Sequence, residues 1–123
     1  MFTIGAGPAG GGDSGACVGT LTSDRNRIED VNKQPEHLER LHYDPAREEE
    51  LIERLIRSDT NYRDNLAYYC FPERNPGTYN SNSYAAGLLR AVGLPDPPFA
   101  DLAESEYPGW RTRVPAHLFS PPE

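Results

Sequence analysis

The sequence predicts an α+β fold in which a small antiparallel sheet packs with about two helices. Two stretches carry apolar residues at helical spacing, one after Asp44 and one after Asn80, and they predict the helices. Short apolar, partly β-branched segments on both sides of a glycine-rich stretch predict paired strands near the N-terminus. Because 123 residues is an ordinary length for one domain, we expect residues 1–123 to form a single domain.

Residues 1–22 are expected to supply these strands. Residues 1–4 and residues 16–21 have strand composition, and residues 5–15 hold most of a glycine-rich loop between them. The same loop matches the dinucleotide-binding pattern G-x-G-x-x-G. That motif works only where a helix begins inside it, and the run Gly10-Gly11-Gly12 is a poor helix former. We therefore predict a turn and no nucleotide site.

The first helix is predicted over residues 44–64. Asp44 can cap its first turn, and Pro45 suits the first helical position, where a missing N–H costs nothing. Residues 23–41, before it, are polar and irregular, whereas residues 66–71, after it, fit either a strand or a packed loop. The helix has an apolar stripe made of Leu51, Ile52, Leu55 and Ile56.

The second helix is predicted over residues 80–93, with Gly93 as its stop. Its buried side is expected to comprise Tyr84, Ala85, Leu88, Leu89 and Val92. Residues 96–123 form a proline-rich tail that we expect to pack on the body of the domain. The side chains that would hold this tail are Trp110, Val114, Leu118 and Phe119.

The charge balance bears on the class of partner. The net charge is -7, with 12 basic and 19 acidic residues, and this argues against nucleic acid, whose binding requires clustered Lys and Arg. No apolar run has the length of about 18 residues that a membrane span needs. The N-terminus shows no signal region, which leaves both the cytoplasm and export by a dedicated secretion system open.

Two cysteines, Cys17 and Cys70, are too few for a disulfide scaffold and lack the spacing of a zinc site. We therefore expect no metal and no cofactor. One bridge between them is an open alternative, but the default expectation is two buried thiols. Cys70 lies in the apolar run Tyr-Tyr-Cys-Phe-Pro, a setting that makes a thiol inert.

Four polar residues, Asn80-Ser81-Asn82-Ser83, stand together where the second helix begins. Asn and Ser are preferred helix caps, but a cap needs only one of them. A nucleophile at a helix N-terminus gains from the helix dipole, and the free N–H groups nearby can hold an oxyanion. The run therefore fits a capping role, a chemical role, or both together.

This run resembles the active-site helix of the circularly permuted papain-like hydrolases. These include desumoylase-like peptidases, lecithin-retinol-acyltransferase-like enzymes and relatives of bacterial cell-wall amidases. Their nucleophile often lies in an Asn-Cys-Asn-(Ser/His)-Phe run that opens a helix. Asn80, Asn82, Ser83 and Tyr84 match that run, and Ser81 stands at the position of the cysteine.

The wider pattern is similar to C-terminal domains of bacterial secreted, toxin-like proteins. The shared elements are Gly7-Pro8, the run over residues 79–84, Pro108-Gly109-Trp110, Val114-Pro115 and Phe119. The resemblance implies a trimmed, permuted papain-like fold. It also implies a bacterial effector or toxin that acts as a hydrolase or acyl-transfer domain on an amide or ester bond of a peptide, protein or ester substrate.

The site that the resemblance implies has a nucleophile, a base and orienting or oxyanion-binding groups. These are Ser81 as nucleophile, His42 or His37 as base, and Asn80, Asn82 and Ser83 with the backbone N–H groups of residues 81–83. The chain departs from the family pattern in two ways, because serine replaces cysteine and the first strands carry no histidine. The third histidine, His117, lies in the tail. These departures motivate an alternative, a catalytically inactive module of the same fold that binds a partner protein.

Overall fold

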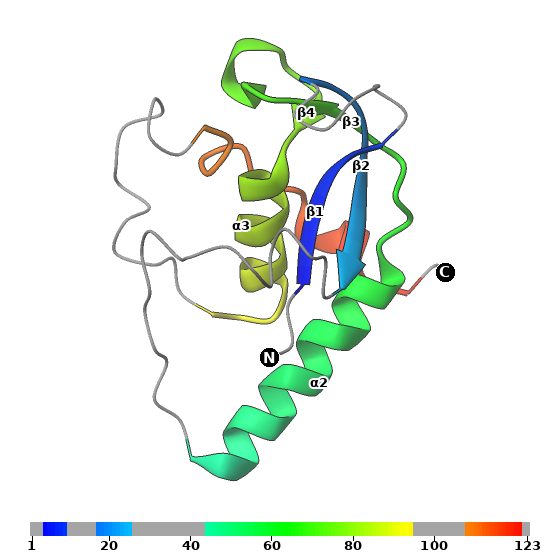
Figure 1. Ribbon diagram of the computed structural model, residues 1–123. Helices are drawn as coiled ribbons and strands as arrows, with labels where there is room; N and C mark the ends of the chain where they lie inside the picture. The colour runs from blue at the N-terminus through cyan, green and yellow to red at the C-terminus, as the bar shows by residue number, and fades with distance from the viewer. Residues whose placement is uncertain (1–3, 10–16, 26–43, 95–107, 122–123) are drawn as a thin grey trace.

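The computed structural model describes residues 4–9, 17–25, 44–94 and 108–121. Within them a four-stranded sheet packs with two α-helices and two short 3-10 helices, which confirms the predicted α+β class (Figure 1). In chain order the elements are β1 (Ile4–Ala9), β2 (Val18–Arg25), α2 (Pro45–Asn61), β3 (Leu66–Tyr69), η1 (Pro72–Arg74), β4 (Thr78–Tyr79), α3 (Ser81–Ala91) and η3 (Ala116–Phe119).

The strands lie in the order β1-β2-β3-β4. β2 pairs antiparallel with β1, as predicted, and it pairs antiparallel with β3 as well, so residues 66–69 form a strand. β4 runs parallel to β3, with Ala67 opposite Thr78, so the sheet is mixed. The chain reaches β4 through η1 and a turn at Gly77, whose φ of 87° is accessible to glycine at little cost.

The prediction of a loop from Gly5 onward was wrong, because β1 continues through Ala9 and every residue in it pairs with β2. Glycine has a low strand propensity, but pairing and packing override propensity in a sheet. Ala6 in this strand is 1% exposed, and Pro8 is tolerated because β1 is an edge strand. The second helix α3 lies beside β1 (Figure 1).

The helix α2 begins as predicted. Asp44 caps it by accepting a hydrogen bond from the Arg47 backbone N–H at 2.9 Å, and Pro45 is its first residue. Leu51 is buried, but Ile52 is 52% exposed, so the predicted apolar stripe is only partly covered. Figure 1 shows α2 crossing obliquely below the ends of β1 and β2.

The helix α3 and the C-terminal segment close the core. Val114 donates its backbone N–H to the Ser83 carbonyl at 3.1 Å, which ties the segment to the first turn of α3. Trp110 and Phe119 are buried, as predicted for the tail. The main core cluster consists of Ala6, Leu21, Tyr62, Tyr84, Leu88, Val114 and Phe119.

Gly87 marks the closest approach between α3 and the C-terminal segment, since a Cβ added there would overlap the Val114 carbonyl. Gly→Ala inside a helix normally stabilises it by about 0.5–1 kcal/mol. We expect Gly87→Ala instead to destabilise the fold by about 2 kcal/mol, because the two segments must move apart. Urea unfolding checks this, and a more stable variant would contradict the close packing.

A buried carboxylate, Asp59 on α2, joins three elements of the core. It is 5% exposed, pairs with Arg25 Nε at 2.9 Å and accepts a hydrogen bond from the Tyr84 hydroxyl. β2 extends to Arg25, beyond its predicted end, because its last four residues pair with residues 4–7 of β1. Nearby, the Tyr62 hydroxyl donates to the Leu21 carbonyl at 2.6 Å.

The two core tyrosines make stability sensitive to alkaline pH. Burial raises the pKa of Tyr62 to about 12 and raises the pKa of Tyr84 as well. Below about pH 10, the pKa of tyrosine in an unfolded chain, both states keep these protons and stability is unaffected. Above it only the folded state keeps them, so the free energy of unfolding should fall by up to about 1.4 kcal/mol per pH unit for each tyrosine. Urea unfolding at successive pH values checks this, with Tyr62→Phe expected to reduce the slope. A flat profile would contradict it.

Candidate functional site

The helix start at Asn80 is a reciprocal cap. The Asn80 side-chain oxygen accepts from the Ser83 backbone N–H at 3.0 Å, and the Ser83 hydroxyl oxygen accepts from the Asn80 backbone N–H at 3.1 Å. Asn80 is 4% exposed and Ser83 is fully buried. The predicted capping role is therefore confirmed for these two residues.

Asn80 also joins α3 to two distant segments. Its side-chain Nδ2 donates to the Cys70 carbonyl at 3.2 Å, just after β3, and to the Pro108 carbonyl at 2.7 Å. Asn82 donates a second hydrogen bond to the Pro108 carbonyl at 2.9 Å. Two asparagines thus hold one carbonyl of the C-terminal segment.

Gly109 completes this arrangement. Its carbonyl accepts from the Ser83 hydroxyl at 2.9 Å, and its N–H donates to both carboxylate oxygens of Glu73, at 2.8 and 3.0 Å. Its φ of 91° and its position against Asn80, where a Cβ would overlap the amide, both require glycine. We call Asn80, Asn82, Ser83, Pro108 and Gly109 the Asn80 clamp.

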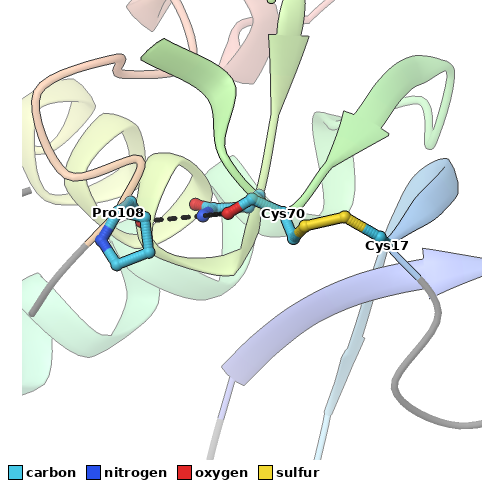
Figure 2. Close-up of a disulfide and its surroundings, with 4 residues drawn as sticks. Cys17, Cys70 and Pro108 are labelled. Atoms are coloured by element: carbon cyan, nitrogen blue, oxygen red, sulfur yellow. Dashed lines mark hydrogen bonds between the residues drawn. A yellow bond between two sulfur atoms is a disulfide. The ribbon is translucent and has the colours of Figure 1, made fainter. Parts of the chain in front are cut away.

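The cysteines form a disulfide, so the default prediction of two buried thiols was wrong. Cys17, just before β2, and Cys70, just after β3, have Cα atoms 4.9 Å apart, and the Cys70 N–H donates to the Cys17 carbonyl at 3.0 Å. The antiparallel pairing of β2 with β3 brings them together, which local sequence does not reveal. Figure 2 shows Cys70 with the disulfide on one side and the hydrogen bonds that lead to Pro108 on the other.

Ser81 differs from the rest of the run because it is exposed. Within the described residues its hydroxyl has no hydrogen-bond partner, and the backbone N–H groups of Ser81 and Asn82 have no acceptor, as is usual in a first helical turn. The Ser83 N–H is occupied by Asn80. Of the three predicted oxyanion donors, two therefore remain available.

An apolar hollow of about 780 Å³ lies between β1, α2 and α3, with Ser81 in its lining. β1 contributes residues 4–8, and Tyr68 of β3 also contributes. The remaining lining consists of Ile52, Leu55 and Ile56 from α2 and Tyr84, Ala85, Leu88 and Leu89 from α3. The volume is typical of a small-ligand site. Among the described lining residues, the tyrosines alone carry ionisable side chains.

The one histidine among the described residues, His117, does not lie near Ser81. His117 is exposed on η3 and lines a different hollow, near Asn61 and Tyr62 at the end of α2. His37 and His42 lie outside the described residues, so the assignment of either as a base stays a prediction. The described residues contain no group of three His, Cys, Asp or Glu side chains that could hold a metal ion.

No protein-family model matches the chain, and no match was found among curated proteins or solved structures. The resemblance to permuted papain-like hydrolases therefore stays a prediction. Of the described helices, none has the length and apolar character needed to cross a membrane.

Sequence reasoning found the helix start but missed its partners. The sequence pointed to Pro108-Gly109 only as part of the resemblance to toxin-like domains, yet both of its carbonyls accept hydrogen bonds from the helix start. The hydrogen bonds that Glu73 accepts from Gly109 could not be predicted from neighbouring residues, since the two residues are 36 positions apart. The exposure of Ile52 at the hollow was hidden by its position in a regular apolar stripe.

Proposed function

We propose that the domain is a non-catalytic interaction module that binds a partner protein or peptide by taking its apolar side chains into the hollow between β1, α2 and α3. The observation that carries the proposal is the hollow itself. Its volume is about 780 Å³, and its lining is mostly aliphatic. Ile52, which is 52% exposed, lies in this lining. Exposed apolar surface gathered in a concave site is typical of a binding surface.

The hydrogen bonds of the helix start support the same proposal. The side chains of Asn80, Asn82 and Ser83 all donate hydrogen bonds to the carbonyls of Pro108 and Gly109. These residues thereby fix the first turn of α3 and the wall of the hollow that it forms. A rigid wall favours binding, because less conformational entropy is lost when the partner is held.

Selection from a displayed peptide library tests the proposal. Ala85→Leu places a larger side chain in the lining of the hollow, and Ala67→Leu makes the same change on an exposed residue of β3 outside it. We expect enriched peptides to share apolar residues, to bind the wild type and Ala67→Leu equally, and to bind Ala85→Leu at least about tenfold more weakly, a loss of about 1.4 kcal/mol. Peptides indifferent to Ala85→Leu would contradict the proposal.

A second candidate function is the hydrolase or acyl-transfer activity implied by the family resemblance. The specific observation in its favour is Ser81, which is exposed, hydrogen-bonds to no described residue and stands beside two available backbone N–H groups. In that reaction the Ser81 oxygen would attack a carbonyl carbon, its proton would pass to His37 or His42, and the N–H groups would hold the oxyanion. The hollow would then hold the apolar part of the substrate.

A fluorophosphonate probe separates the two candidates. An activated serine displaces fluoride and gains a phosphonyl group, which intact-mass measurement detects. The enzyme hypothesis expects one adduct that is lost in Ser81→Ala and kept in Ser120→Ala, a matched change at an exposed serine far along the chain. No adduct on the wild type would leave the binding module as the better account.

A further inference from the structure

The disulfide and the Asn80 clamp are joined at Cys70. Cys70 holds Cys17 through its sulfur and through its N–H, and it holds Asn80 through its carbonyl. We infer that the Cys17–Cys70 disulfide is a redox-sensitive lock on the Asn80 clamp, so that the helix start beside the hollow is fully ordered only in an oxidising environment.

One hydrogen bond separates the disulfide from the clamp. Asn80 Nδ2 donates to the carbonyl of Cys70 itself, and the same nitrogen donates to the Pro108 carbonyl. A shift of the backbone at Cys70 therefore displaces the acceptor of a buried amide. Because a buried amide needs its partners, Asn80 has to move with that shift or lose a hydrogen bond.

A second connection between the disulfide and the C-terminal segment runs through η1. Glu73 lies three residues after Cys70 and accepts both of its hydrogen bonds from the Gly109 N–H. The segment that leaves the disulfide thus binds the C-terminal segment at Pro108 through Asn80 and at Gly109 directly. Both contacts depend on where the chain lies after β3, and the disulfide fixes that position against β2.

The disulfide can be opened by thiol–disulfide exchange. Two thiols of a reduced dithiol give up two electrons and two protons, form their own disulfide, and leave Cys17 and Cys70 as thiols. Both cysteines are half-buried rather than sealed in the core, which leaves them open to exchange. Disulfides persist in oxidising compartments and are rare where thiols are kept reduced.

This inference rests on the proposed function only for its consequence, namely that reduction weakens binding in the hollow. The lock itself is a property of the folded chain. Amide hydrogen exchange measures the order of the helix start directly and without any ligand. The lock can therefore be confirmed or refuted even if the hollow binds no partner.

The experiment compares exchange in the oxidised wild type and after reduction by a dithiol. In the oxidised protein we expect the Ser83, Gly109 and Val114 amides to be protected about as well as central α2 amides such as Leu55. After reduction, Leu55 should keep the protection that the lowered global stability allows, whereas the other three amides should be at least about tenfold less protected than Leu55. The Cys17→Ser/Cys70→Ser variant should show the reduced pattern without reductant and should not respond to it. Unchanged protection at Gly109, or an equal loss in α2, would overturn the inference. The second result would make the disulfide a general stabiliser or essential for folding.

Discussion

Replacing Asn80 by alanine is expected to lower the free energy of unfolding by about 3 kcal/mol. The loss of the cap accounts for about 1 kcal/mol of this. The rest arises because the half-buried Cys70 carbonyl loses its bond to the Asn80 amide and Pro108 keeps only its bond to Asn82. Unsatisfied buried acceptors cost about 1–3 kcal/mol each.

The matched control is Asn82→Ala, which removes one bond to a carbonyl that Asn80 still holds. We expect it to cost about 1 kcal/mol, the net value of one hydrogen bond. Urea unfolding of both variants gives the comparison. Equal effects would mean that Asn80 has no special role at the crossing of the three segments.

Loss of the disulfide in Cys17→Ser/Cys70→Ser is expected to lower the free energy of unfolding by about 4 kcal/mol, because the cross-link restricts an unfolded loop with a sequence separation of 53 residues. Unfolding in urea, with and without a dithiol, measures this. The dithiol should destabilise the wild type by a similar amount and leave the variant unchanged. A variant as stable as the wild type would show that the bond contributes little to the fold.

Local signals predicted the helices well. Asp44 and Pro45 determine the start of α2 by contacts within a single turn, and the Asn80–Ser83 cap does the same for α3. Such contacts are encoded by neighbouring residues, so the sequence alone reveals them.

The parts that were missed depend on distant partners. Gly5 and Gly7 have no intrinsic preference for a strand, and they adopt strand conformation because they pair with β2. The disulfide depends on how β2 and β3 align, and the Asn80 clamp depends on carbonyls 10 and 28 residues away. Bringing such distant positions together costs conformational entropy, and contacts throughout the fold offset that cost. Neighbouring residues therefore do not reveal these pairings.

The role of the helix start was predicted in part. Its polar run was identified correctly as a cap, and its chemical role at Ser81 stays a prediction. The structure gives a further role to Asn80, Asn82 and Ser83, which hold the C-terminal segment against α3. Asn and Ser serve equally well as helix caps and as hydrogen-bond donors to a distant segment, so composition does not distinguish the two roles.

The most direct test of the central claim is a titration of the methyl NMR signals with hexanol, a small probe with an apolar chain. If the hollow between β1, α2 and α3 is a binding site, the signals of Ile52, Leu55, Leu88 and Leu89 should shift saturably. Ala85→Leu should suppress these shifts, and Ala67→Leu should leave them as in the wild type. Shifts that stay linear in hexanol, or that spread evenly over the methyl groups of the chain, would contradict a binding site there.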